Sequence, residues 1–239
     1  AKCRAGFEAN GVLIMPEFVT RSAIDAIRTE GEANRDAVYA KRETHTVYLS
    51  ATDPEFAPDH ARNRLVVSSK GCLTDDQVPA ESALRSLYDS PLFREFLCDV
   101  LSEKTLYEYA DPLSSINLHI AKTGEELGWH FDNSSFSITL MVQPPERGGQ
   151  FEYIGGVRDA DAGDMNFEAV DDILDGKVEV KELIADAGTL VFFRGRNAIH
   201  RVTPNEGDRT RMLAVLAYNS EPGVALSEEA RMTFYGRTG

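Results

Sequence analysis

The stretch "GWHFDNSSF", residues 128–136, places a histidine and an aspartate two positions apart in a segment that is typical of a β-strand. Successive side chains of a strand point to opposite faces of the sheet, so the His130 imidazole and the Asp132 carboxylate share one face while Phe131 faces the other way. Such a pair either stabilises a sheet surface or binds a metal ion. The residues that the fold brings to the same face decide between the two.

A second segment, "GTLVFFRGRNAIHRVTP" (residues 188–204), contributes His200 in another predicted strand. Two histidines and one carboxylate form the facial triad of non-haem Fe(II) oxygenases, which leaves the remaining coordination positions to co-substrate and dioxygen. Arg209 and Arg211 follow, at the start of the apolar run "MLAVLAYN". A guanidinium inside a barrel matches the distal carboxylate of a 2-oxo diacid bidentately. The two arginines have the same strand parity, and we favour Arg211 because it leads directly into the apolar strand.

The order of the predicted elements indicates an α+β fold with a mainly β core. Helical patterns dominate the first half of the chain, whereas short β-branched or aromatic runs bounded by Gly, Pro, Asn or Asp follow from about residue 113. This order predicts an antiparallel sandwich or barrel with helices packed on one side. We expect a single domain, 1–239. It comprises helices and early strands (1–112), a catalytic β core (113–219) with an excursion at 156–186, and a C-terminal segment (220–239).

The composition disfavours several classes of partner. The formal net charge of the 239 residues is -14, which makes a nucleic-acid backbone or an anionic membrane surface an unexpected ligand. The three cysteines are far apart and form no CxxC motif, which argues against a disulfide framework and suits a reducing cytoplasm. The apolar run "VLIM" is too short for a membrane span. We therefore expect a cytoplasmic protein with a small-molecule substrate; no pattern indicates its oligomeric state.

These motifs together resemble the Fe(II)/2-oxoglutarate-dependent dioxygenase superfamily: "WHFD" after a strand, then "GTLVFFRGRNAIHRVTP", then an arginine. The resemblance covers about residues 113–219. It implies a double-stranded β-helix, the cupin-like jelly roll, buttressed by the N-terminal helices. It also implies Fe(II), 2-oxoglutarate and O2, with His130, Asp132 and His200 as metal ligands and Arg211 or Arg209 as the co-substrate arginine.

Within that superfamily, "GGQFEYI" (148–154) and the short chain resemble the small-molecule branch that contains hydroxylases and halogenases of free amino acids. In such halogenases Gly or Ala replaces the carboxylate and vacates a site for chloride. The presence of Asp132 therefore implies hydroxylation and argues against chlorination. The expected reaction is hydroxylation of an unactivated C–H bond of a free amino acid or similar metabolite, with release of succinate and CO2. Desaturation and ring closure use the same machinery.

Two other functions fit the same residues. One is a cupin-type metalloenzyme that does not use 2-oxoglutarate, and the other is a non-catalytic jelly-roll binding module in which the His/Asp face only stabilises the sheet. One further residue is a candidate for the co-substrate site: Asn117 shares a strand face with His119 and is expected to hydrogen-bond the co-substrate. The alternative for Asn117 is a buried polar residue that ties strands together.

Overall fold

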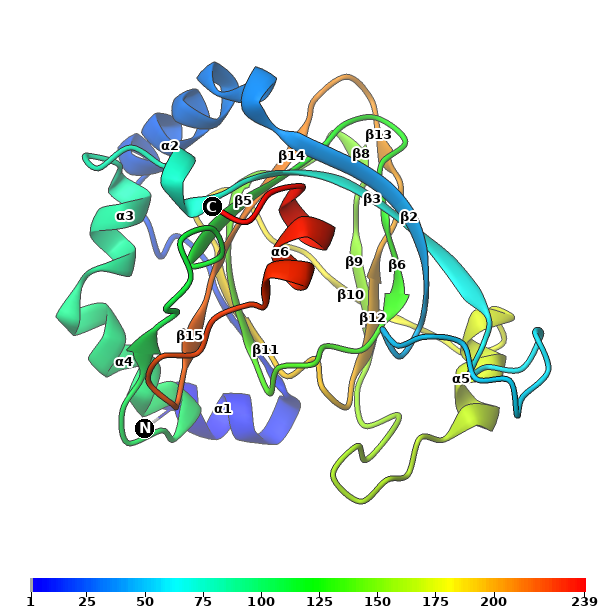
Figure 1. Ribbon diagram of the computed structural model, residues 1–239. Coiled ribbons are helices and arrows are strands. Elements are labelled where there is room, and N and C mark those ends of the chain that lie inside the picture. Colours follow the sequence, from blue (N-terminus) through cyan, green and yellow to red (C-terminus); the bar gives the residue numbers. More distant parts are fainter. Residues whose placement is uncertain (1) are drawn as a thin grey trace.

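The computed structural model describes residues 2–239 and shows a curled antiparallel β-sheet with helices along one side (Figure 1). The helices are α1 (Lys2–Asn10), α2 (Arg21–Ala33), α3 (Ala83–Tyr88), α4 (Pro91–Leu101), α5 (Phe167–Leu174) and α6 (Glu228–Tyr235), with 3-10 turns η1 (Arg35–Ala37) and η2 (Asp75–Gln77). The strands are β1 (Val12–Met15), β2 (Tyr39–Thr46), β3 (Leu65–Leu73), β4 (Tyr107–Glu108), β5 (Ile116–Ala121), β6 (Leu127–His130), β7 (Ser137–Gln143), β8 (Arg147–Gly148), β9 (Phe151–Ile154), β10 (Lys181–Leu183), β11 (Leu190–Phe193), β12 (Ile199–Val202), β13 (Asn205–Glu206), β14 (Arg211–Leu216) and β15 (Tyr218–Asn219).

The main sheet has eleven strands in the order β1-β11-β7-β14-β5-β3-β6-β12-β9-β10, with β2 paired to β3. All of its pairings are antiparallel. The sheet curls on itself, so that the β6-β12-β9-β10 part lies across an interior from the β11-β7-β14-β5 part (Figure 1). This is a double-stranded β-helix, and the predicted jelly-roll core is confirmed.

The N-terminal helices cover the outer face of the larger part of the sheet (Figure 1). On β5 the alternate residues Ile116, Leu118 and Ile120 are buried in one apolar cluster with Ile24 and Ile27 of α2. The period of two therefore sends these three side chains toward the helices and leaves the intervening ones facing the barrel interior. The helices act as the expected buttress.

A second apolar cluster lies outside the smaller part of the sheet. It joins Trp129, Phe131 and Ile199 to Val170 and Ile173 of α5, within the 156–186 excursion. Because these side chains face outward, the residues that alternate with them along β6 and β12 face inward. Burial of this cluster is thus what aims the candidate metal ligands into the barrel.

No helix within residues 2–239 is long and apolar enough to cross a bilayer. Cys3, Cys72 and Cys98 are free thiols.

Candidate active site

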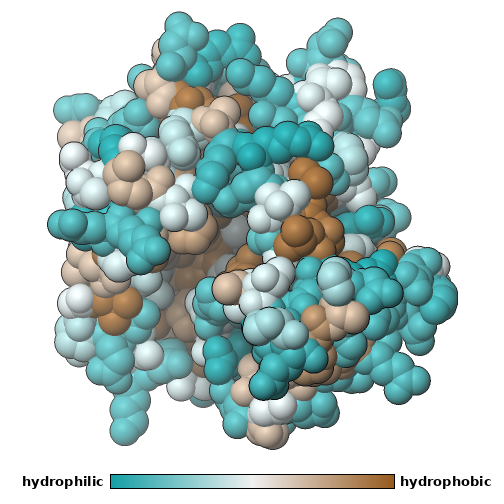
Figure 2. Space-filling model, turned by 45° about the vertical axis from the view of Figure 1, so that its right-hand side comes forward, coloured by the Kyte–Doolittle hydropathy of each residue, from teal (hydrophilic) through white to brown (hydrophobic). Residues whose placement is uncertain are grey.

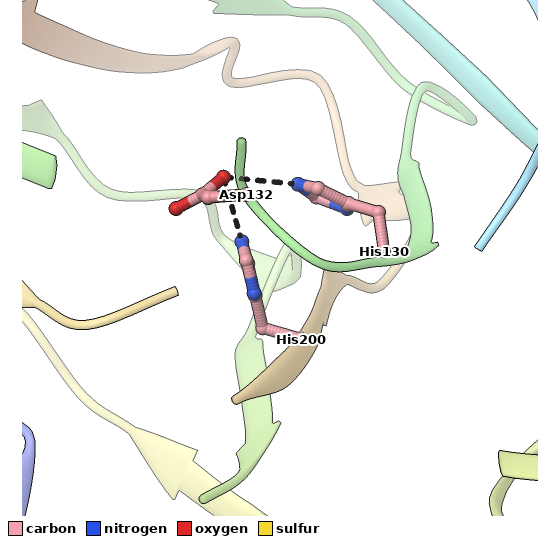
Figure 3. Close-up of side chains that lie close together, drawn as sticks. All are labelled: His130, Asp132 and His200. Carbon is pink, nitrogen blue, oxygen red and sulfur yellow. Dashed lines mark ion pairs between the residues drawn. The ribbon is translucent and has the colours of Figure 1, made fainter. Parts of the chain in front are cut away.

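Three potential metal ligands meet where β6 ends and β12 begins. His130 ends β6 and is the cross-strand partner of His200 in β12, and Asp132 follows two residues after His130. The Asp132 Oδ1 atom lies 3.5 Å from His200 Nε2 and 3.9 Å from His130 Nε2. Both imidazoles point their Nε2 edge toward the carboxylate (Figure 3). Within residues 2–239 this is the sole cluster of three or more potential ligands, with one donor atom from each residue inside 4.8 Å.

Backbone carbonyls fix the tautomer of both histidines. His130 Nδ1 donates to the Gly128 carbonyl at 2.8 Å, and His200 Nδ1 donates to the Ala198 carbonyl at 3.0 Å. A carbonyl oxygen only accepts, so the proton is on Nδ1 and the Nε2 lone pair is free for a metal. Burial, together with the neighbouring His200, lowers the pKa of His130 to about 3. The His130 imidazole is therefore neutral, as a metal ligand must be.

The Asp132 carboxylate is held by backbone packing. Burial alone would raise its pKa, but interactions with the neighbouring His200, His130 and Lys70 outweigh burial, so the pKa of Asp132 is lowered and the group is ionised. Its backbone N–H donates to the Gly195 carbonyl at 3.0 Å. A β-carbon at Gly195 would clash with the carboxylate, so the glycine leaves the space that this side chain fills. Neither the sequence motif nor strand parity marked Gly195.

The donor set fits a non-haem iron. Two imidazoles that each carry a proton on Nδ1 and one ionised carboxylate converge on one point, and no fourth His, Cys, Asp or Glu ligand joins them in the part of the chain that the structure describes. A facial triad of this kind leaves coordination positions open for a bidentate co-substrate and dioxygen. The geometry is consistent with Fe(II) bound by His130, Asp132 and His200.

The structure separates the two candidate arginines. Arg211 opens β14 and is buried in the barrel interior with 5% exposure, and its Nε atom has no hydrogen-bond partner. Burial lowers its pKa to about 10. Arg209 is exposed, and its guanidinium donates to the Pro145 carbonyl at 2.9 Å. Arg211 is thus the arginine that faces the interior with unused donors, and Arg209 is bound at the rim.

A cavity of about 320 Å³ lies beside Arg211. Phe151 and Phe193 line it, and their rings pack against the His200 ring with centroids 5.4 and 4.9 Å apart. None of the three metal ligands lines this cavity directly; a second cavity of about 160 Å³ reaches His130. The aromatic pair therefore separates the larger cavity from the metal centre.

The structure does not place Asn117 as expected. Its amide nitrogen donates to the Leu113 and Ile116 carbonyls at 2.7 and 2.8 Å, and its Oδ1 accepts from the Tyr235 hydroxyl at 2.8 Å. Both N–H groups are used, so Asn117 has none to offer a co-substrate carboxylate. The residue instead ties α6 to β5, which is the alternative that a buried strand asparagine also fits.

No sequence pattern predicted that Lys70 would lie in the barrel interior. Lys70 of β3 shares a strand face with Ser68 and Cys72, and its Nζ lies 3.2 Å from each ring nitrogen of His119. No motif surrounds Lys70, and a single lysine in a polar strand is normally a solvated residue. Only the pairing of β3 with β5 and with β6 brings it into the barrel.

Comparison with known proteins places this geometry in a family. Residues 1–233 match the model of the Halogenase D family (HalD). Curated proteins gave no match. Among solved structures, the chain is similar to the non-haem α-ketoglutarate-dependent carbocyclase SnoK from nogalamycin biosynthesis (TM-score 0.62, 15% identity, covering 99% of this chain and 91% of that one). It is also similar to HygX of Streptomyces hygroscopicus, solved with nickel, 2-oxoglutarate and hygromycin B (TM-score 0.59, 13% identity, 91% and 86%).

A third similar structure is a prolyl-4-hydroxylase of Pseudomonas putida (TM-score 0.56, 13% identity, covering 90% of this chain and 95% of that one). At such identities the structural likeness shows the fold, the double-stranded β-helix. The family is shown by the match over almost the whole chain, and the metal triad agrees with it. The chain belongs to the Halogenase D family, within the Fe(II)/2-oxoglutarate-dependent oxygenase superfamily.

Proposed function

We propose that this oxygenase hydroxylates an unactivated C–H bond of a free amino acid or a closely related small metabolite. The observation that carries the proposal is the Asp132 carboxylate. Ionised and packed against Gly195, it would be the third ligand of a metal held by His130 and His200, and so would take the place that a chloride ligand needs. The name of the family points to halogenation as the second candidate, and the carboxylate argues against it.

The roles of the chain's own residues follow from their positions. His130, Asp132 and His200 would bind the iron, and the fixed Nδ1 hydrogen bonds would keep both imidazoles oriented. The buried guanidinium of Arg211 would bind the distal carboxylate of 2-oxoglutarate bidentately. The site would then supply the chemistry of iron and 2-oxoglutarate, which is oxidation of a C–H bond by dioxygen with release of succinate and CO2.

The aromatic residues near the triad would exclude water from the metal centre. Phe151 and Phe193 pack on the His200 ring, and Phe193 is buried, so they shield one side of the metal centre from solvent. A dry site protects a reactive centre from side reactions. It also strengthens the charge interaction between Arg211 and a bound carboxylate.

The cavity that reaches His130 supports a small, zwitterionic substrate. This cavity has a volume of about 160 Å³, which suits a small molecule rather than a polymer. Its walls carry one positive and one negative side chain, Lys41 and Glu43, which form an ion pair. The ring of Phe234 adds an apolar wall. A carboxylate beside an ammonium group complements a zwitterion. The face of the molecule shown in Figure 2 is hollowed, with apolar surface inside and polar side chains around the rim.

The test begins with an anaerobic titration of Fe(II) and 2-oxoglutarate into the apoprotein, followed by the weak visible absorption band of the iron chelate. Wild type should develop the band and His130→Ala should not. A library of free amino acids is then screened with O2 by succinate release and product mass. Products with one added oxygen support hydroxylation, whereas products with chlorine contradict it. Iron binding without the band would favour the cupin-type enzyme, and no iron binding would favour the non-catalytic module.

A further inference from the structure

A chain of side-chain hydrogen bonds joins β2, β3 and β6 behind the metal ligand His130. His45 of β2 has its Nδ1 atom 2.9 Å from the Thr46 carbonyl and its Nε2 atom 2.7 Å from the Ser68 hydroxyl of β3. The Ser68 Oγ atom accepts from the Gly128 backbone N–H at 3.0 Å. Gly128 belongs to β6, and its carbonyl accepts from His130 Nδ1. The chain therefore ends on the residue that fixes the orientation of the His130 imidazole.

The direction of each bond in this chain follows from the groups that can only accept or only donate. A carbonyl oxygen only accepts, so the neutral His45 imidazole carries its proton on Nδ1 and donates it to Thr46. Nε2 of His45 is then an acceptor, and the Ser68 hydroxyl donates its one proton to that atom. The lone pairs of Ser68 Oγ are left for the Gly128 N–H, which only donates. His45 thus orients the Ser68 hydroxyl so that it accepts from β6.

The two strands approach closely at this point because Gly128 has no side chain. β6 joins β3 where Leu127 is the register partner of Ser68. A β-carbon at Gly128 would lie 2.5 Å from the Val67 carbonyl oxygen, which is closer than real side chains come. The glycine of the "GWHFD" motif therefore lets its backbone reach the Ser68 hydroxyl. Ser68 is buried with 8% exposure, so solvent competes little for this bond.

His45 also packs against the metal ligand. The His45 and His130 rings lie edge to face, with centroids 6.2 Å apart and an angle of 89° between their planes. His45 and Ser68 both line the cavity that reaches His130. Contact with the substrate is therefore the competing role for both residues, and metal binding in the absence of any substrate separates the two roles.

We propose that Ser68, oriented by His45, is a positioning residue of the metal site, which holds β6 at Gly128 so that the Nε2 lone pair of His130 points at the metal. This assignment rests on the proposed function, because it presupposes that His130 binds iron. Hydrogen bonds that orient a metal-bound imidazole typically contribute about tenfold to a hundredfold to metal affinity. Ser68 and His45 contribute through the backbone of β6 and are not themselves ligands.

The experiment measures the dissociation constant of Fe(II) by anaerobic calorimetric titration of the apoprotein, with neither 2-oxoglutarate nor substrate present. Ser68→Ala should weaken Fe(II) binding about tenfold, and His45→Phe, which keeps a ring but loses the Nε2 acceptor, should weaken it by a similar factor. Ser68→Thr retains the hydroxyl and should bind iron as wild type does. Ser69→Ala is the matched control, because this neighbouring buried serine accepts from the Glu126 N–H at 3.3 Å, further along the chain from His130. The control should leave the dissociation constant unchanged.

Amide hydrogen exchange of the apoprotein provides a readout that does not depend on the metal. The Gly128 amide should exchange faster in Ser68→Ala than in Ser69→Ala, because only the first variant removes its acceptor, whereas the amides of β7 should exchange alike in both. Equal exchange of the Gly128 amide in the two variants would contradict the proposed bond.

The iron titrations decide the assignment. Equal Fe(II) affinity in Ser68→Ala and Ser69→Ala would overturn it. So would weak binding by Ser68→Thr, which would make side-chain volume rather than the hydroxyl responsible, and wild-type affinity in His45→Phe would remove the role of His45. A wild type that binds no Fe(II) refutes the proposed function and this assignment together, whereas a wild type and a Ser68→Ala variant that bind iron equally refute the assignment alone.

Discussion

Substitution of Gly195 by alanine tests whether packing against the backbone positions the metal carboxylate. The backbone of Gly195 has no left-handed conformation, so the change tests space alone. A β-carbon there would meet the Asp132 Cβ at 2.9 Å, and would meet the carboxylate atoms closer still. Rotation of the side chain leaves the Cβ contact in place, so the Asp132 backbone has to move.

The size of the effect follows from these distances. Carbon atoms pack best at about 3.5–4.0 Å, so Asp132 Cβ must retreat by at least about 0.6 Å. Metal–ligand distances tolerate only about 0.2 Å of error. Disturbance of a residue that orients a ligand typically costs about tenfold to a hundredfold in metal affinity, and we expect Gly195→Ala in this range. Overpacking should also lower the free energy of unfolding by about 1–3 kcal/mol.

The assay is calorimetric titration of the apoprotein with Fe(II) under anaerobic conditions, supported by chemical unfolding. Gly155→Ala is the matched control, because a β-carbon at Gly155 meets nothing within 4 Å and its backbone conformation is likewise unstrained. The control should bind iron as wild type does. If Gly195→Ala binds iron within twofold of that control, the segment around Asp132 yields freely, and the account of how the carboxylate is positioned is wrong.

Four further substitutions test the two candidate arginines, the C-terminal helix and the Asp76–Arg237 ion pair. Arg211→Met should weaken 2-oxoglutarate about tenfold to a hundredfold, since a charge-assisted hydrogen bond contributes about 1.5–3 kcal/mol, whereas Arg209→Met should leave the dissociation constant unchanged. Tyr235→Phe should lower the free energy of unfolding by about 1–3 kcal/mol without affecting 2-oxoglutarate affinity, because it removes one buried structural hydrogen bond. Hydrogen bonding to Arg237 lowers the pKa of Asp76 below 3.8, so this pair stabilises the fold above that pH and the contribution is lost as the pH falls through the lowered value. Asp76→Asn should therefore cost about 0.5–1 kcal/mol in urea unfolding at neutral pH and nothing in strong acid; an equal cost at both would contradict the assignment.

The metal ligands were predictable because they depend on local geometry. Strand parity alone puts His130 and Asp132 on one face and Trp129 and Phe131 on the other, and the structure shows the aromatic pair in the outer cluster. Side chains of a strand alternate between the two faces of the sheet, so the face of each residue follows from its position in the sequence. The same holds for the helices of the buttress, where apolar spacing marks the buried face.

Parity could not choose between Arg209 and Arg211, because both have the same strand phase. Only the tertiary structure decides, by starting β14 at Arg211 and leaving Arg209 at the rim. Asn117 shares a strand face with His119 as predicted, but its N–H groups donate to the Leu113 and Ile116 carbonyls and its Oδ1 accepts from Tyr235 of α6. The partner comes from 118 positions away, and no local pattern encodes such a contact.

The surroundings of Gly195 and Lys70 could be identified only from the tertiary structure. A glycine after a strand is typical of a turn, and a lysine in a polar strand is typical of a solvated edge. The close approach to Asp132 and the burial beside His119 and Arg211 arise only when β3, β5, β6 and β12 assemble. The sequence determined the identity of the ligands and their sides of the strands, because these follow from backbone periodicity. Tertiary structure decided the supporting residues, because packing between distant strands depends on the whole topology.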